Sequence, residues 1–324
     1  MKVNSTLIML TWTMTIGVMV SMSSNSWVMM WSGIEISMMS FIPMMTINTT
    51  LSSESCVKYF IIQSISSMVM TMGILMMATK KTMNYEVILS ISLMMKLGAT
   101  PFHNWVLSVI EGMDYLTLVN LIVTMKLAPL CLLSYLSMNM MLIPSMTMIT
   151  GSFMGMNQNS IRKLIGCSSI FNLGLVMNIT PVNLNWMMYM LMYSLMTTTL
   201  VMKLKNMKIT YLNQLTMNNY KKMLKLKMWV ILLSMGGMPP TLGFTAKLMA
   251  LETMIQMKMM INSIVMIMTS LIVMYFYMRI TSLSLMYSST STKNKMFMSN
   301  ESSIILMMVN LIGLPMLILI KLMP

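Results

Sequence analysis

The chain has 324 residues, of which 57% are apolar and 9% are charged, and its mean hydropathy is +0.77. Soluble domains carry about 25% charged residues, so this composition excludes a water-soluble enzyme, a nucleic-acid-binding protein and a disordered scaffold. In a soluble protein the net charge of +14 would favour a nucleic-acid partner. In a membrane protein such an excess is typical of loops on one side of the bilayer, so the expected surroundings are membrane lipid and not nucleic acid.

The cysteines and the histidine leave little room for a metal or redox group. Cys56, Cys131 and Cys167 are separated by 75 and 36 residues, and the absence of a Cys-x-x-Cys pair argues against iron–sulfur and zinc sites. The single histidine, His103, cannot build a haem or metal site alone. We therefore expect this chain to bind no cofactor.

Eleven apolar runs are each long enough for a transmembrane helix, which needs about 20 residues. Only helices satisfy their backbone groups inside one such segment. We therefore expect an all-α integral membrane protein, a single polytopic domain over 1–324 with about eleven transmembrane helices. The predicted spans are 5–22, 27–46, 57–78, 85–111, 115–136, 138–157, 159–179, 184–205, 227–256, 258–285 and 302–322, with a long polar loop at 206–226.

The distribution of lysine and arginine predicts the orientation of these spans. Fourteen of the 21 basic residues fall at the N-terminus or beside the loops after even-numbered spans. Four fall on the opposite side: Lys80, Lys81, Lys258 and Lys321. Since basic loops stay on the positive-inside face, the N-terminus is expected on that face and the C-terminus on the other.

Two long spans carry helix breakers in their middle. Span 85–111 holds Gly98 and Pro101, and span 227–256 holds Gly237 followed by two prolines. Proline removes a backbone donor and clashes with the preceding turn, so both helices are expected to break. Broken backbone at membrane depth is tolerated where it is buried in protein or lines a wet cavity.

The position of the two breaks indicates an internal repeat. They lie five helices apart, and a unit of five spans that is repeated once must be inverted in the membrane. We therefore expect two inverted five-helix repeats, 5–136 and 138–285, with a last helix at 302–322. Interrupted segments at matching places in inverted halves point to a transport path, whereas ordinary proline kinks in a bundle are the alternative.

Four charged residues fall inside predicted spans, namely Glu35, Lys96, Lys126 and Lys247. Each costs about 2.5–3.5 kcal/mol at a helix centre, so they are expected to face inward, near one another or near water. Burial disfavours an ammonium group and a nearby carboxylate favours it, a combination that suits proton transfer. The alternative is a static salt bridge between Glu35 and one lysine that pins helix packing.

His103 follows the first break, in the run Pro-Phe-His-Asn-Trp at 101–105. Histidine changes its charge near physiological pH and can relay protons. A lone histidine more often donates a hydrogen bond to a neighbouring carbonyl. Both interpretations stay open at this point.

Four segments resemble, in chain order, the mitochondrial NADH dehydrogenase subunit 2 family of respiratory complex I. They are WSGIEISMMSFIP at 31–43, KLGATPFHNW at 96–105, GMNQNSIRK at 155–163 and LSMGGMPPTLGF at 233–244. The resemblance implies an antiporter-like membrane-arm subunit of the mitochondrial inner membrane, with its N-terminus on the matrix side. It further implies that protons move along mid-membrane lysines and a glutamate, which match Glu35, Lys96, Lys126 and Lys247 here.

The resemblance also implies which groups lie elsewhere in the complex. Flavin, iron–sulfur clusters, NADH and ubiquinone belong to other subunits, so this chain would hold no redox centre. The implied partners are the other membrane-arm subunits, including neighbouring antiporter-like ones. Two departures from the family pattern are Asn172, at a place where the family often has histidine, and Ala246 and Leu248, which flank Lys247 where proline and tryptophan are usual.

Two other functions stay open on the sequence alone. A stand-alone cation/proton antiporter would share the broken helices and the buried lysines. A purely structural spacer between neighbouring subunits would need neither.

Overall fold

The structure, a computed structural model, describes residues 5–46, 49–79, 85–136, 142–181, 185–217 and 222–290, and gives no account of the side chains of 216–226 and 283–290. The described residues form fourteen α-helices and one isolated backbone bridge, between Ser160 and Tyr211. They divide into two compact units, Met1–Thr147 and Met148–Pro324, here called unit 1 and unit 2. The predicted last span at 302–322 lies outside the described residues.

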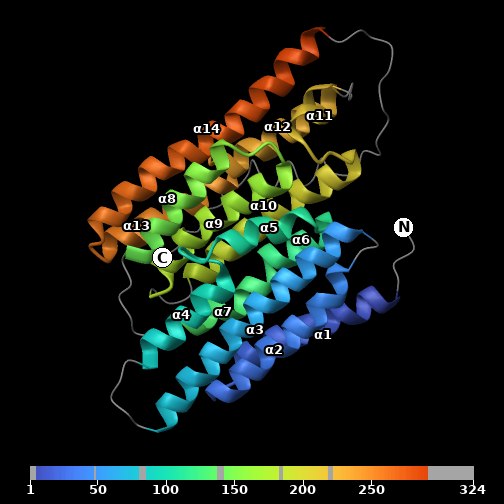
Figure 1. Ribbon diagram of the computed structural model, residues 1–324. Helices are drawn as coiled ribbons and strands as arrows, with labels where there is room; N and C mark the ends of the chain where they lie inside the picture. Colours follow the sequence, from blue (N-terminus) through green and yellow to red (C-terminus); the bar gives the residue numbers. More distant parts are fainter. Residues whose placement is uncertain are drawn as a thin grey trace. The chain divides into compact units, whose positions relative to one another are not determined.

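Unit 1 consists of a row of packed helices (Figure 1). In chain order they are α1 (Ser5–Ser23), α2 (Trp27–Met45), α3 (Thr50–Ala78), α4 (Tyr85–Leu97), α5 (Asn104–Glu111), α6 (Tyr115–Ile122) and α7 (Thr124–Ser134). Consecutive long helices lie side by side: α1 on α2, α2 on α3, and α3 on α4, while α7 packs against α1, α2 and α4. This arrangement places the middle of α2 near the C-terminal end of α4.

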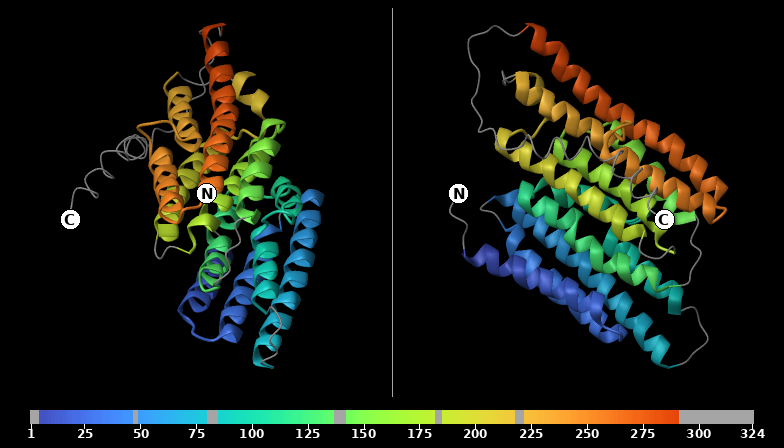
Figure 2. Two further views of the ribbon diagram at one scale, coloured as in Figure 1. Left: turned by 90° about the vertical axis from the view of Figure 1, so that its left-hand side faces the viewer. Right: turned by 180° about the vertical axis from the view of Figure 1, so that it is seen from behind.

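Unit 2 is built around a central helix that is covered on several sides. The division between the units falls within α8 (Leu142–Met156), which is followed by α9 (Ile161–Ile179), α10 (Asn185–Met207), α11 (Leu212–Met217), α12 (Lys222–Gly236), α13 (Leu242–Gln256) and α14 (Met260–Thr290). Helix α9 is buried along nearly its whole length and contacts α10, α13 and α14. Figure 2 shows the long α14 running beside α12.

The described helices have the length and composition of a multi-pass membrane protein. Five segments are long and apolar enough to cross a bilayer: Ser5–Ser23, Trp27–Met45, Thr50–Ala78, Tyr115–Ser134 and Met260–Ser282. The outer sides of α1 and α3 expose large apolar side chains; Met9, Trp12 and Met68 are 72%, 66% and 69% exposed. Such surfaces are stable against lipid and not against water.

Both predicted helix breaks are present, and their backbones are built alike. Helix α4 ends before Gly98, with φ of +72°, and α12 ends before Gly237, with φ of +83°. In this left-handed region a side chain is disfavoured, so glycine ends the helix. The residue after each glycine donates its N–H to the carbonyl five positions back, from Ala99 to Met94 at 3.0 Å and from Met238 to Leu233 at 3.2 Å.

The helix pair α1–α2 is held close by small residues. A Cβ atom at Gly17 would lie 2.7 Å from the backbone nitrogen of Ser37, and a Cβ atom at Gly33 would lie 2.7 Å from that of Ser21. Each glycine therefore faces the other helix at a distance that only a glycine allows. Small residues four apart are a common way of bringing membrane helices into contact, and this contact fixes the helix that carries Glu35.

Replacement of Gly33 by alanine is expected to weaken this contact. The new methyl group would overlap the α1 backbone, so the helices must separate, at a cost of about 1–3 kcal/mol. The measurement is thermal unfolding of the purified complex that contains the variant chain. Gly236→Ala is the matched control because its Cβ atom would lie 3.6 Å from the nearest atom, an ordinary contact; equal stability of the two variants would contradict the expectation.

The start of one helix and the extent of one loop differ from those expected from the sequence. Helix α3 begins at Thr50 and not at 57, because the hydroxyl of Thr49 accepts a hydrogen bond from the backbone nitrogen of Ser52 and caps the helix. Lys58 therefore lies on α3, in an exposed ion pair with Glu54. The predicted loop at 206–226 contains α11 and the start of α12.

The span predicted at 115–136 is also interrupted, which the sequence did not indicate. It is divided at Val123 (φ −103°, ψ −71°) into α6 and α7. The hydroxyl of Thr124 donates to the carbonyl of Asn120 at 2.7 Å and satisfies a backbone group at the break. Neither glycine nor proline stands at the break itself, so the residues that usually mark a broken helix gave no signal.

Candidate functional site

Glu35 and Lys96 form an ion pair inside unit 1. The Lys96 Nζ atom donates to Glu35 Oε1 at 3.1 Å. The side chain of Lys96 is 1% exposed and that of Glu35 is 18% exposed. The residues are 61 positions apart in the chain, and they meet because α2 and α4 both pack on α3. The pair is therefore a tertiary contact between helices in the interior of the unit.

The broken end of α4 is stabilised by two side chains. Gln63 Nε2 donates to the Lys96 carbonyl at 3.2 Å, and Trp105 Nε1 donates to the Met95 carbonyl, also at 3.2 Å. The last carbonyls of a helix have no partner within the helix, and in an apolar interior each must find a donor. Gln63 and Trp105 thus hold the backbone that positions Lys96, and neither was expected from the sequence.

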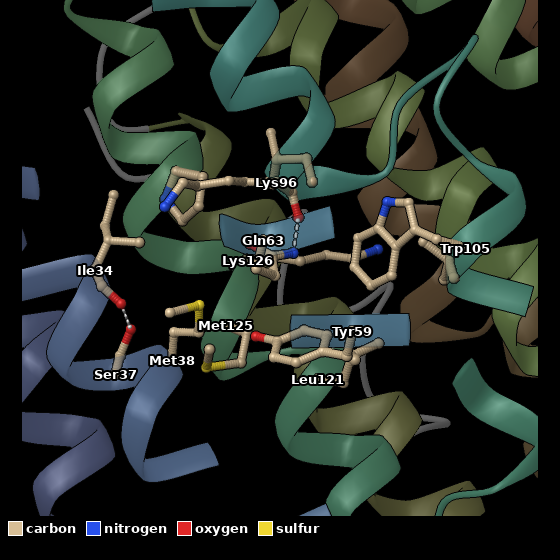
Figure 3. Close-up of a pocket in the computed structure, with 13 residues that line it drawn as sticks. Ile34, Ser37, Met38, Tyr59, Gln63, Lys96, Trp105, Leu121, Met125 and Lys126 are labelled. Carbon is tan, nitrogen blue, oxygen red and sulfur yellow. Dashed lines mark hydrogen bonds between the residues drawn. The ribbon is translucent and has the colours of Figure 1, made fainter. Parts of the chain in front are cut away.

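Lys126 shares a cavity with Lys96. The cavity has a volume of about 20 Å³ and is lined by side chains from α2, α3, α4, α5, α6 and α7. Figure 3 shows Tyr59, Gln63, Lys96, Trp105 and Lys126 around it. A space of this size with polar groups in its wall holds about one water molecule.

Lys126 lies just after the break at Val123 and is only 6% exposed. It occupies the first turn of α7, and Pro129 follows in the same helix. Proline has no N–H to donate to the carbonyl four positions back, which adds a carbonyl without a helical partner near the cavity. The second broken span of unit 1, like the first, thus places polar backbone groups near this cavity.

In unit 2, Lys247 occupies a comparable position at the break between α12 and α13. Its Nζ atom donates to the carbonyl of Gly236, the last residue of α12, at 2.7 Å. The same atom lies 5.6 Å from the ring centre of Phe171 on α9, a cation–π distance. The residue also lines a cavity of about 260 Å³ between α12, α13 and α14, whose walls are mostly apolar.

His103 does not form the hydrogen bond to a carbonyl that was one of the two alternatives for it. Both ring nitrogens are buried, and neither has a hydrogen-bond partner among the described residues. No carbonyl of the described residues therefore accepts a hydrogen bond from the His103 ring. The residue stands immediately before α5 and after the break that follows Lys96.

The structure thus brings three of the predicted residues together and places the fourth in the other unit. Glu35, Lys96 and Lys126 lie around one interior region of unit 1, and Lys247 lies at the break of unit 2. Within the described ranges, no group of three or more His, Cys, Asp and Glu side chains could hold a metal ion. Lysine and glutamate are side chains that can bind and release protons.

Comparison with protein families and curated proteins gives consistent matches. The family model described as NADH:quinone oxidoreductase/Mrp antiporter, TM, matches residues 24–85 and 77–273. NADH-ubiquinone oxidoreductase chain 2 of Anopheles gambiae is 35% identical over 320 residues, 94% of each chain. The chain 2 protein of Locusta migratoria is 35% identical over 277 residues, which are 82% of this chain and 81% of that protein.

Solved structures share the fold at low sequence identity. A chain of respiratory complex I from Thermus thermophilus with bound aureothin superposes with a TM-score of 0.79 at 18% identity, covering 97% of this chain and 79% of that one. A chain of the Mrp complex from Dietzia superposes with a TM-score of 0.76 at 14% identity, covering 84% of this chain and 59% of that one. The fold is therefore the all-helical, antiporter-like membrane fold of complex I.

The family model covers most of the chain, and the curated relatives cover nearly all of it in both directions. The identity to chain 2 proteins exceeds 30% over that length. The chain belongs to the NADH:quinone oxidoreductase/Mrp antiporter membrane family, and within it to the NADH-ubiquinone oxidoreductase chain 2 proteins.

Proposed function

We propose that the proton route of this complex I membrane subunit runs through Glu35, Lys96, Lys126 and Lys247. The observation that carries the proposal is the interior ion pair between Glu35 and Lys96 beside a cavity that Lys126 also lines. A charged pair is expensive in a membrane interior, and a buried pair gives little net stability. Proton transfer requires ionisable side chains in the interior, whereas helix packing alone does not.

The chemistry needs no group beyond the side chains and water. When the Glu35 carboxylate moves away from Lys96, or is neutralised, the ammonium of Lys96 loses its counter-charge and gives up a proton. One water in the shared cavity can accept that proton and pass it to Lys126. Return of the carboxylate favours reprotonation of Lys96, so the position of Glu35 controls whether Lys96 holds or releases its proton.

Lys247 continues the route in unit 2. Its ammonium group is held by the free carbonyl end of α12 and by the face of the Phe171 ring. The C-terminal end of a helix carries partial negative charge and favours a cation, so the break supplies the stabilisation that a carboxylate supplies to Lys96. His103, with buried ring nitrogens, is a further relay candidate in this proposal.

We also assign the topology within this proposal. The chain forms one polytopic domain of about eleven spans in the mitochondrial inner membrane, with its N-terminus on the matrix side. The halves 5–136 and 138–285 are inverted five-helix repeats, supported by the equal backbone construction at Gly98 and Gly237. The chain works next to other membrane-arm subunits, antiporter-like ones among them, and leaves flavin, iron–sulfur clusters, NADH and ubiquinone to other subunits.

Two alternative functions make different predictions. A stand-alone cation/proton antiporter would be stable and active when purified alone, whereas this subunit is expected to co-purify with other complex I chains. A structural spacer would tolerate the loss of its interior lysines without any change in proton pumping.

Replacement of Lys247 by methionine tests the proposal in unit 2, since Glu35 and Lys96 lie in unit 1. Methionine fills a similar volume but carries no proton, so the number of protons pumped per NADH oxidised is expected to fall while the complex still assembles. The control is Lys258→Met, an exposed lysine in the turn after α13. Unchanged pumping in the Lys247 variant of the reconstituted complex would remove this residue from the route.

A further inference from the structure

Unit 2 contains a buried lysine that has no anionic partner among the described residues. Lys203, near the C-terminal end of α10, is 9% exposed. Its ammonium group forms no hydrogen bond and no ion pair within the described part of the chain. Buried charges in proteins are normally paired, so the ammonium group of Lys203 indicates a place where an anion binds.

A second lysine strengthens the need for an anion at this place. The ammonium groups of Lys203 and of Lys227 on α12 are close enough to repel each other, and α10 contacts α12. Lys227 also forms no ion pair with any described residue. Repulsion between like charges is strong where little water surrounds them, and an anion that binds both lysines removes it.

The described part of unit 2 does not supply this anion itself. Its one carboxylate side chain is that of Glu252, which lies on α13 beyond the break at Gly237. Glu252 is not among the groups that act electrostatically on Lys203. The other acidic residue of the unit, Glu301, lies outside the described residues. The anion is therefore expected from beyond the described part of the chain.

Further basic side chains belong to the same end of unit 2. Helices α9, α10, α12 and α14 meet there around a small apolar cavity, and each contributes a lining residue that directly follows a basic one. These lining residues are Leu164, Leu204, Met228 and Ile280. The basic residues before them, here called the basic cluster, are Lys163, Lys203, Lys227 and Arg279. Basic residues at one end of membrane helices are typical of the positive-inside face.

An exposed apolar surface on α10 leads to the basic cluster. Met188, Leu191, Leu195 and Met202 are large apolar residues that are exposed, and their spacing places them on one side of the helix. Such a surface is stable against lipid chains. Since Met202 directly precedes Lys203, this apolar side ends beside the basic cluster. A molecule with an apolar chain and an anionic head fits both surfaces at once.

We infer that the basic cluster binds the phosphate headgroup of an anionic phospholipid, whose acyl chain lies along the exposed apolar side of α10. Lys203 and Lys227 hold the phosphate between them, and the other two basic residues add positive charge around it. Basic pockets between transmembrane helices commonly bind such headgroups. A lipid fits better than a soluble anion or an acidic peptide, because it covers the apolar surface as well as the charges. The inference is independent of the proposed proton route.

The test places the intact complex in phosphatidylcholine nanodiscs that contain a small fraction of photoactivatable phosphatidylglycerol. Crosslinks to peptides of α10 and α12 are counted by mass spectrometry. Lys203→Met and Lys227→Met are made singly and together; they keep side-chain volume and remove the mutual repulsion, so assembly is expected to be retained. Crosslinking is expected to fall about fivefold for each lysine lost. Lys258→Met, which removes an exposed lysine in the turn before α14, is the matched control and is expected to label like the wild type.

Two further probes separate the possible anions. Photoactivatable phosphatidylcholine is expected to label this site weakly, and an excess of inorganic phosphate is expected to leave the phosphatidylglycerol crosslinks in place. Equal labelling by the two lipids, displacement by free phosphate, or unchanged labelling of the double variant would overturn the inference.

A cryo-EM map of the wild-type complex gives a readout that does not depend on the variants. Density for a lipid headgroup is expected between Lys203 and Lys227. A carboxylate in that place, from Glu301 or from a neighbouring subunit, would overturn the inference and leave the proposed proton route untouched.

Discussion

Glu35→Gln is expected to lower the number of protons pumped per NADH oxidised while the complex stays assembled. Glutamine keeps the size of the side chain and can still accept a hydrogen bond from Lys96, but it cannot carry the negative charge that stabilises the buried ammonium group. Lys96 then remains neutral and has no proton to transfer to Lys126. The cost of leaving a buried charge without its partner, about 3–5 kcal/mol, is the reason that Lys96 loses its proton in this variant.

The measurement is the ratio of protons pumped to NADH oxidised in proteoliposomes that contain the variant complex. Glu54→Gln is the matched control: Glu54 pairs with Lys58 on the same helix, and these side chains are 59% and 45% exposed. Exposed pairs contribute about 0–1 kcal/mol, so this control is expected to behave like the wild type. Normal pumping in the Glu35 variant would mean that the pair is only a structural contact.

Lys126→Met is expected to lower proton pumping without lowering the thermal stability of the complex. The variant loses the group that receives the proton across the cavity, so the number of protons pumped per NADH oxidised is expected to fall. At the same time it removes an ammonium group that is 6% exposed and replaces it with an apolar chain of similar volume. Burying a charged ammonium group in an apolar interior is costly, so thermal stability is expected to stay equal or rise.

The two readouts are proton pumping and the unfolding temperature of the same purified variant. Lys258→Met controls for the loss of one positive charge because Lys258 lies at the surface, in the turn before α14. A Lys126 variant that pumps normally would contradict its role in the route. A variant that is strongly destabilised would instead indicate that Lys126 holds the helices together.

The sequence predicted most of the helices because their signals are local. Runs of apolar residues marked the spans. Gly98 and Gly237, with Pro101 and Pro239 shortly after them, marked the two predicted breaks, which the structure contains. The break at Val123 was missed because it depends on how Thr124 bonds back to Asn120 and on packing, and not on a breaking residue. The start of α3 was placed too late because Thr49 caps a polar first turn that hydropathy treats as loop.

The site was harder to predict because it is formed by distant contacts. Each buried charge could be identified from its cost in a span, but nothing in the sequence set the distance between Glu35 and Lys96, 61 residues apart. Gln63 and Trp105 were missed, although a glutamine in the middle of an apolar helix is a signal that a backbone group needs a donor.

The most direct test of the whole account replaces Lys96, Lys126 and Lys247 by methionine in one chain. The assembled complex is reconstituted into proteoliposomes, and protons pumped are measured together with NADH oxidised. The expected result is an assembled complex whose ratio of protons to NADH is lower than that of the wild type. Normal assembly with a normal ratio would contradict it and leave the subunit as a spacer between its neighbours.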